Sequence, residues 1–264
     1  MARLARLVTA SALALQLIPR IGIAQDDKST SKTFLTPRDG AIATTFLVAT
    51  IGLSVFDPRI ARFFEDTSLS HVQLGERLGN VFTHVNETTL TVGGLVVYGA
   101  ARLTKANTVA DIAFHATESV VLASLTSQLI RGPLGRSRPQ ETDFKDQYDF
   151  HAFKGFTNFK YRAFPSIHSS SGFAAASALV AETKLRKPSA VWYVAPVAYA
   201  FALTPGLSRM YLGQHWASDI FAGAFLGTFA GWKIVDYSHA HPKTKTDRIF
   251  LDAAPTGIVL SWSF

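Results

Sequence analysis

The sequence predicts an all-α fold, a single helical bundle of about six core helices. Six apolar segments rich in Ala, Leu and Gly recur along the chain, and none keeps the period-two alternation of a half-buried strand. Pro, Gly or clustered charges, such as those of residues 184–188, separate them. A chain of 264 residues with 48% hydrophobic composition can bury one sizeable core, so we expect one main domain.

The expected helices follow one another with short polar breaks. The first comes after a polar stretch, residues 25–39, and the second and third are joined by a connector that holds Lys105. The fourth follows Ser166, a residue type that caps helix starts. The fifth follows Pro188, and the sixth opens near His215. Their expected ranges are 41–56, 88–103, 109–130, 169–182, 189–205 and 216–235.

Residues 1–24 have the composition of an export signal. Two arginines precede an apolar run, Leu7 to Ile18, and the small residues Gly22 and Ala24 follow it. This pattern predicts a secretory signal peptide, with an uncleaved N-terminal anchor as the alternative. Residues 25–264 then form the domain, and either reading places it outside the cytoplasm, in the periplasm or a comparable compartment, with possible association with the inner membrane.

The sequence is compatible with two membrane topologies. A spanning helix needs about 20 predominantly apolar residues, and most of the six segments fall short. If all six span, the basic connectors at Lys105 and at residues 184–188 share one side with the tail, and the positive-inside rule makes that side cytoplasmic. A cleaved signal places the same connectors outside. Either the bundle is soluble or peripherally bound, which the short segments favour, or residues 1–24 are not a cleaved signal.

Composition excludes several classes of function. Cysteine is absent, which excludes disulfides, thiolate metal sites and a cysteine nucleophile. The net charge is +7, but three of these charges lie in residues 1–24, so the remainder carries 7 − 3 = +4. Without a run of Lys or Arg, that excess does not indicate a nucleic-acid partner.

A first cluster of candidate binding residues lies at 131–139, where Arg131, Arg136 and Arg138 fall directly after the third expected helix. A guanidinium presents a planar fork of donors that can hold phosphate oxygens in pairs. The alternative is a solvated basic end that balances the helix dipole.

A second cluster, residues 164–168, opens the fourth expected helix. Ser166 at the start of a helix caps it, while the first backbone N–H groups, including that of Ile167, form a natural anion site. His168 could protonate a leaving oxygen. Taken alone, such a cluster is more often a cap beside an ordinary histidine.

A third cluster, residues 208–219, leads into the sixth expected helix. His215 and Asp219 stand four residues apart, so the carboxylate can reach the imidazole. Such a pair fixes the tautomer and leaves the other ring nitrogen free as base or nucleophile. Arg209 adds a further guanidinium, and a local hydrogen bond at a helix start is the alternative reading.

Together the clusters resemble the type 2 phosphatidic acid phosphatases (PAP2), which are related to bacterial class A acid phosphatases and vanadium haloperoxidases. That family shows K-x6-R-P, then P-S-G-H, then S-R-x5-H-x3-D. This chain reads R-x6-R-P from Arg131, P-S-I-H from Pro165 and S-R-x5-H-x3-D from Ser208. The order and internal spacing agree, and the resemblance covers residues 111–235. The chain departs in having Arg131 for the lysine and Ile167 for the glycine.

The resemblance implies a role for each matched residue. The phosphate would be bound by Arg131, Arg138, Arg209, Ser166 and the backbone N–H of Ile167. His215 would attack phosphorus and form a phosphohistidine, with Asp219 orienting it and His168 as general acid. The resemblance implies no metal and no cofactor, because cationic side chains and backbone dipoles take the charge that Mg²⁺ carries elsewhere.

The expected substrate is a phosphomonoester or pyrophosphate, most favourably a lipid phosphate. Residues 140–163, between two of the clusters, interleave aromatic and basic residues, which suits a membrane interface or a lid packed on the bundle. A non-specific periplasmic acid phosphatase on soluble phosphomonoesters is the alternative. Readings of another class are a vanadate-dependent haloperoxidase and a non-catalytic phosphate-binding bundle.

Overall fold

A computed structural model describes residues 33–66 and 81–241, and the chain from residue 34 onward forms one compact unit. The signal peptide predicted at residues 1–24 lies outside the described residues. Within them the regular structure is helical, apart from one antiparallel bridge between Arg136 and Phe150. The all-α prediction is therefore confirmed.

All six predicted helices are present. They are α2 (Pro37–Ser54), α5 (Glu87–Leu103), α6 (Asn107–Leu134), α8 (Ile167–Arg186), α9 (Val191–Tyr211) and α10 (Ala217–Ala240). Shorter elements join them: α3 (Asp57–Asp66), η2 (Pro139–Thr142), α7 (Lys154–Thr157), η3 (Phe159–Tyr161) and η4 (Pro188–Ala190). The charged helix α3 was not predicted, because it lacks a continuous apolar segment.

Polar side chains and one glycine set the helix ends. Thr36 and Asp39 form a reciprocal capping box at the start of α2, and Asn86 caps α5. Ser166 caps α8 by accepting from the Ser169 N–H, as the sequence predicts. Gly135 ends α6 in the left-handed conformation, at φ 61°, which suits a residue without a side chain.

Two of the helices that run further than the sequence predicts contain a proline. Helix α6 includes Arg131 and Pro133, and α9 continues through Pro205 to Arg209 and beyond. Arg131 and Arg209 were expected in connectors, whereas both lie in the last turn of a helix. A proline removes one backbone hydrogen bond, a loss that tertiary packing can offset, and Pro205 is fully buried here.

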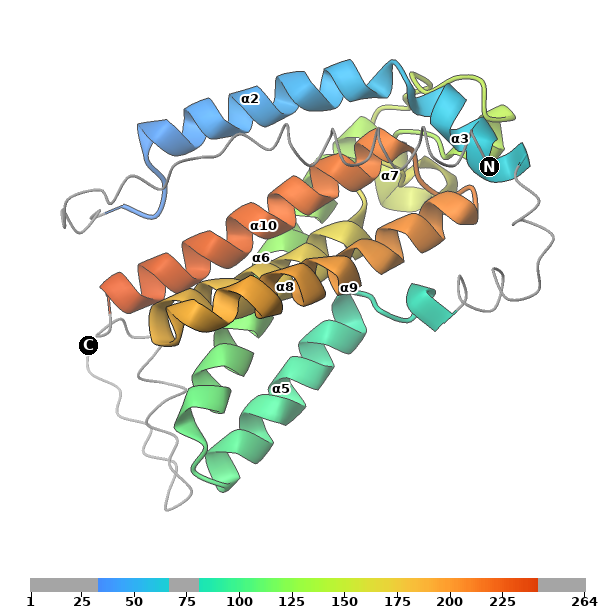
Figure 1. Cartoon of the computed structure of the whole chain (residues 1–264). Coiled ribbons are helices and arrows are strands. Elements are labelled where there is room, and N and C mark those ends of the chain that lie inside the picture. Colours follow the sequence, from blue (N-terminus) through green and yellow to red (C-terminus); the bar gives the residue numbers. More distant parts are fainter. Residues whose placement is uncertain (1–32, 67–80, 242–264) are drawn as a thin grey trace. The chain divides into compact units, whose positions relative to one another are not determined.

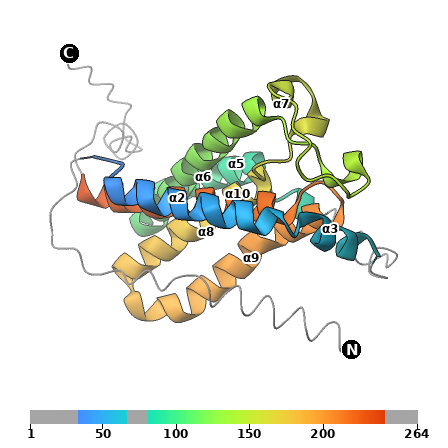
Figure 2. The ribbon, with the colours of Figure 1, turned by 90° about the horizontal axis from the view of Figure 1, so that it is seen from above.

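Helices α8 and α10 form the core of the bundle. They pack against each other along a seam where Gly223, Gly227 and Gly231 of α10 meet the backbone of α8. A Cβ at Gly227 would lie 2.2 Å from the Ser170 carbonyl oxygen, so only glycine permits this approach. Helices α6 and α9 flank α8, and α2 lies along α10 (Figures 1 and 2).

The bundle has two chemically distinct ends. At the first, which we call the site end, Ser54 at the close of α2 lies 3.1 Å from the Tyr148 hydroxyl and Asp57 contacts Ser218. At the other, the far end, Lys233 near the close of α10 donates to Asp39 at the start of α2, at 2.7 Å. The loop between α6 and α8 gathers with α3 at the site end (Figure 1).

Many large apolar side chains on the outer helix faces are exposed. Ten of them, each more than half exposed, are Leu47, Val48, Ile51, Val92, Val96, Leu125, Leu129, Trp192, Val197 and Phe201. None of these ten lies on α8 or α10. By length and composition, one described helical stretch, Pro188–Tyr211, could cross a membrane. Helix α2 with Asp57–Glu65 passes the same test as a pair bent by 56°.

Candidate active site

The three clusters converge at the site end of the bundle. Arg131 ends α6, Ser166 precedes α8, Arg209 lies in the last turn of α9 and His215 directly precedes α10. Arg138 precedes η2 in the connector. These side chains are buried, as are Ile167 and Asp219, while His168 is half-buried. Segments far apart in sequence thus supply one pocket.

Several nitrogen atoms in this pocket have no protein partner. Among the described residues, the buried side-chain atoms without a hydrogen bond include Arg138 Nε and Nη1, Arg209 Nε, His168 Nδ1 and His215 Nδ1. Leaving a buried polar atom unpaired costs about 1–3 kcal/mol, so proteins rarely do so without a functional reason. The arrangement suits an anion with several oxygens.

Electrostatic effects within the pocket point the same way. Burial lowers the pKa of Arg138 to about 9, and the nearby charges of Arg209 and Arg131 add to this effect. A bound dianion would relieve that repulsion. Burial, together with Arg138 and Arg209, also holds the pKa of His215 well below its usual range. The His215 imidazole is therefore neutral at neutral pH, the form that can act as a nucleophile.

Asp219 lies beside His215 without a hydrogen bond to it. The His215 Nδ1 and Asp219 Oδ2 atoms are 3.5 Å apart, beyond normal hydrogen-bond length. Asp219 Oδ2 instead accepts from the Trp216 N–H at 2.7 Å. The orienting role of Asp219 therefore stays a prediction, and it requires a small movement of the imidazole that brings Nδ1 within hydrogen-bond distance of the carboxylate.

The start of α8 presents backbone donors to the pocket. Ile167 is the first residue of α8 and is not among the described non-glycine residues with positive φ, so a β-branched residue fits there without strain. Its N–H lies at a helix N-terminus, where backbone donors lack intrahelical acceptors. Ser166 N–H donates to the Asp219 carbonyl at 3.0 Å, which fixes this helix start against α10.

A buried network that the sequence did not predict supports Asp219. Arg136, 2% exposed, donates from Nη1 to Asp219 Oδ1 at 2.5 Å and from Nη2 to Asp57 Oδ2 at 2.8 Å. Asp57 also accepts from the Ser218 N–H at 2.9 Å and contacts its hydroxyl. Burial alone would lower the pKa of Arg136, but Asp219 and Asp57 raise it. Arg136 and Asp57 are 79 residues apart, so no local pattern links them.

The connector between α6 and α8 forms the outer wall of the pocket. The Phe159 ring lies 3.6 Å from Arg138 Cζ, a close cation–π contact. Gln214 donates to Gln140 at 2.8 Å and lies 3.5 Å from Arg209 Nη2. Other aromatic side chains of the connector face solvent: Tyr148, Phe150, Phe153 and Phe156.

Comparison with known proteins agrees with this geometry. The family model of the PAP2 superfamily matches residues 112–242, a range that contains all three clusters. The chain belongs to the PAP2 superfamily. This confirms the resemblance drawn from the motifs.

Relatives of this PAP2 chain include proteins named as lipid A phosphatases. The lipid A 1-phosphatase of Rhizobium etli is 33% identical over 116 residues, 43% of this chain and 44% of the relative. The lipid A 4′-phosphatase of Bacteroides thetaiotaomicron is 32% identical over 76 residues, 29% of this chain and 31% of the relative. The matches thus span less than half the length of these relatives.

A solved structure is also similar. It is the transmembrane PAP2-type phosphatidylglycerolphosphate phosphatase of Bacillus subtilis, with a TM-score of 0.42 and 19% identity. The similarity covers 74% of this chain and 98% of the other.

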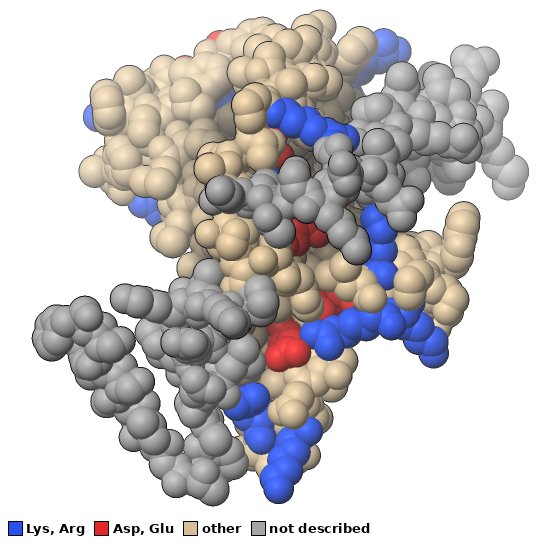
Figure 3. Space-filling model, turned by 90° about the vertical axis from the view of Figure 1, so that its left-hand side faces the viewer, with Lys and Arg blue, Asp and Glu red and all other residues tan. Residues whose placement is uncertain are grey.

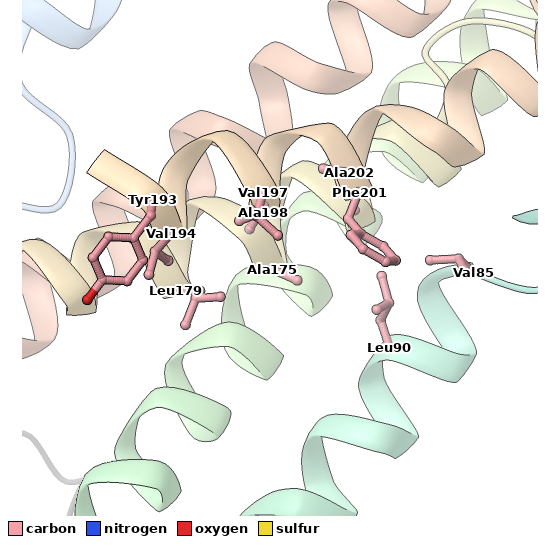
Figure 4. A pocket seen from close by; sticks show the side chains of 12 residues that line it. Val85, Leu90, Ala175, Leu179, Tyr193, Val194, Val197, Ala198, Phe201 and Ala202 are labelled. Carbon is pink, nitrogen blue, oxygen red and sulfur yellow. The ribbon is translucent and has the colours of Figure 1, made fainter. Parts of the chain in front are cut away.

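An apolar groove adjoins the PAP2 site. It has a volume of about 500 Å³ and lies among α5, α8 and α9. Phe201 of α9 and Leu90 of α5 point toward one another at one end, and Tyr193 and Leu179 mark the other (Figure 4). Gly172, which also lines it, is one helical turn from His168. The groove therefore begins close to the pocket and runs away along α9.

Proposed function

We propose that the protein is a metal-independent phosphohydrolase that removes phosphate from a lipid phosphate or pyrophosphate through a phosphohistidine at His215. One observation carries this proposal: unpaired guanidinium and imidazole nitrogens from three chain segments meet in one buried pocket. Such preorganised donors stabilise the charge of a transferring phosphoryl group.

Each residue then has a defined task. Arg131, Arg138 and Arg209 bind the phosphate oxygens, helped by Ser166 and the Ile167 N–H. The neutral His215 imidazole attacks phosphorus as the bond to the leaving oxygen breaks, and His168 acts as the general acid that gives a proton to that oxygen. Water then cleaves the phosphorus–nitrogen bond, which releases inorganic phosphate and regenerates His215.

The groove supports a lipid as substrate. Its walls are apolar, it opens on the exposed face of α9, and it begins one turn from His168, so an acyl or isoprenyl chain fits there while the phosphate occupies the pocket. The named activities of the Rhizobium and Bacteroides relatives, both on lipid A, favour the same substrate class.

The outer surface supports a membrane-embedded bundle. Exposed apolar side chains cover α2, α5 and α9, far more than a soluble monomer normally leaves in water. Exposed aromatic residues at the connector and at Trp192 suit the two interfaces. This favours embedding over the soluble bundle that the short segments suggested.

The distribution of charge supports one orientation. Lys105 follows α5, and residues 184–187 form the last turn and C-cap of α8, all at the far end. The positive-inside rule therefore makes that end cytoplasmic and the site end periplasmic. Helix α2 starts at the cytoplasmic end, because Asp39 pairs with Lys233. This orientation puts the start of α2 on the cytoplasmic side, which argues against the secretory signal predicted at residues 1–24.

A substrate panel tests the activity. Purified full-length protein is assayed without added metal on phosphatidate, isoprenyl pyrophosphate and p-nitrophenyl phosphate. We expect lipid substrates to be preferred, inhibition by vanadate, and loss of turnover in His215→Ala with an unchanged melting temperature. Undiminished hydrolysis by His215→Ala would refute the mechanism, and peroxide-dependent bromination with bound vanadate would indicate a haloperoxidase instead.

A second experiment tests the groove. Ala198 lines it, whereas Ala200 lies exposed on α9 outside it, so Ala198→Phe fills the groove and Ala200→Phe is the matched control. We expect Ala198→Phe to lose at least tenfold in kcat/KM on a long-chain lipid phosphate and little on p-nitrophenyl phosphate. Equal effects on both substrates would place the lipid chain elsewhere and favour the soluble-phosphomonoester alternative.

A further inference from the structure

A second polar cluster lies at the far end of the bundle, away from the phosphate pocket. It consists of His115 of α6, Glu182 of α8 and His239 of α10. His115 Nδ1 lies 2.6 Å from Glu182 Oε1, and His239 Nε2 lies 2.8 Å from the same oxygen. Helices α6, α8 and α10, which pack against one another, therefore contribute one side chain each.

We infer that His115, Glu182 and His239 form a binding site for a divalent transition metal ion, with Zn²⁺ as the best fit. The three ligand atoms lie within 4.8 Å of one another. Two imidazoles and a carboxylate are a ligand set that Zn²⁺ accepts, with bonds of about 2.0–2.2 Å and a fourth position for water. Tetrahedral bonds of that length hold ligand atoms about 3.3 Å apart. Small rotamer changes in the two histidines would suffice.

The surroundings hold Glu182 in the orientation that a metal ligand needs. Its side chain is fully buried, and Arg186 Nε binds the other carboxylate oxygen, Oε2, at 2.7 Å. Arg186 in turn pairs with Asp111 at 3.0 Å. A carboxylate fixed in this way presents Oε1 to the two imidazoles, the supporting arrangement typical of metal sites. Two carboxylates against one guanidinium also leave a net negative charge, which favours a cation.

The site has a route to solvent. His115 and Glu182 are buried, whereas His239 is exposed, so an ion can enter past its imidazole. The far end of the bundle carries acidic side chains beside basic ones (Figure 3).

The metal would act on the bundle and not on phosphate. Along α8, His168 and Glu182 are 14 residues apart, which corresponds to about 21 Å. Helices α6, α8 and α10 carry Arg131, Ser166 and Asp219 at their other ends, so a metal would fasten together the helices that position the pocket. The ligands are 67 and 57 residues apart in sequence, which explains why no motif indicated the site.

Metal binding to the untagged, full-length protein tests the inference. After chelator treatment and dialysis, the protein is titrated with Co²⁺ and, separately, Zn²⁺. We expect one equivalent of either ion, visible Co²⁺ absorption bands typical of four- or five-coordination, and displacement of Co²⁺ by Zn²⁺. At free Zn²⁺ 100-fold above Kd, the melting temperature should rise by about 5–10 °C.

Variants assign the ion to this site. His239→Ala, at an exposed position, should fold normally yet weaken Co²⁺ binding at least tenfold, and Glu182→Gln should do the same. His151→Ala, which removes a partly exposed histidine paired with Asp149, is the matched control and should bind Co²⁺ like the parent. His215→Ala should also keep the Co²⁺ bands even though it abolishes turnover, so failure of the proposed activity and failure of the metal site can be told apart. Absence of bound metal, or equal affinity in His239→Ala and the parent, would overturn the inference and leave a hydrogen-bonded cluster.

Discussion

Replacing Arg136 by alanine should destabilise the protein more than any single change on its surface. The guanidinium is 2% exposed and pairs with two fully buried carboxylates, Asp57 and Asp219. Removing one partner of a buried ion pair costs about 3–5 kcal/mol, because the remaining charge is left uncompensated. In the variant the Trp216 and Ser218 N–H groups still donate to these carboxylates. We therefore count the cost of about 3–5 kcal/mol once for the whole network and not once for each carboxylate.

The expected shift is measurable. For a domain of this size, 1 kcal/mol changes the melting temperature by about 2–4 °C, so a loss of about 3–5 kcal/mol lowers it by roughly 6–20 °C. Melting followed by circular dichroism in a fixed detergent measures this shift. Turnover at a temperature where the variant is folded should also fall, since Asp219 loses the group that holds it beside His215.

Two further variants make the result specific. Arg162 also donates from its guanidinium near the pocket, but to the backbone carbonyls of Gly155 and Phe156 and to no carboxylate. Arg162→Ala should therefore cost only about 1 kcal/mol. Arg136→Lys keeps the charge but can meet only one carboxylate, so it should fall in between. A melting temperature of Arg136→Ala within 2 °C of the parent would refute the reasoning.

Three other predictions concern catalysis and packing. His168→Ala should lose more activity on poor leaving groups than on p-nitrophenyl phosphate, and equal losses would argue against its role as general acid. Because the pKa of His215 is held well below 6.5, the acid limb of kcat/KM against pH should lie below pH 6.5, and a limb at or above that value would contradict a neutral, buried nucleophile. Gly227→Ala should destabilise the protein by about 1–3 kcal/mol in thermal melts, since the added Cβ would meet the α8 backbone. Gly99→Ala, where nothing lies within 4 Å of the added Cβ, should stabilise it by about 0.5–1 kcal/mol. Similar changes in melting temperature for the two variants would mean that the seam is not tightly packed.

Sequence patterns predicted the helices well because each rests on local information. Thr36, Asn86 and Ser166 cap their helices through contacts within three residues, and the apolar segments are continuous. Helix ends at Pro133 and Pro205 were misplaced, because packing decides whether a proline stops a helix. The candidate site residues could be named because a family resemblance supplied the long-range information that spacing alone lacks, and their roles stay predictions.

Two clusters show what local reasoning misses. Asp57 and Arg136 are joined only when α3 folds against the connector, and neither stands in a pattern that distinguishes it from an ordinary surface ion pair. His115, Glu182 and His239 lie on three different helices. Both clusters depend on tertiary contacts between segments more than 50 residues apart, which composition and periodicity do not encode.

The glycine seam between α8 and α10 has a consequence for leaflet selectivity. Because the two helices touch backbone to backbone from Gly223 to Gly231, the seam between them offers no passage for a phosphorylated headgroup. In the proposed orientation, His215 then reaches only lipids whose headgroups already face the periplasm. A lipid made in the cytoplasmic leaflet must be flipped across before it can be dephosphorylated, so the supply of substrate is set by a separate flippase and not by this protein.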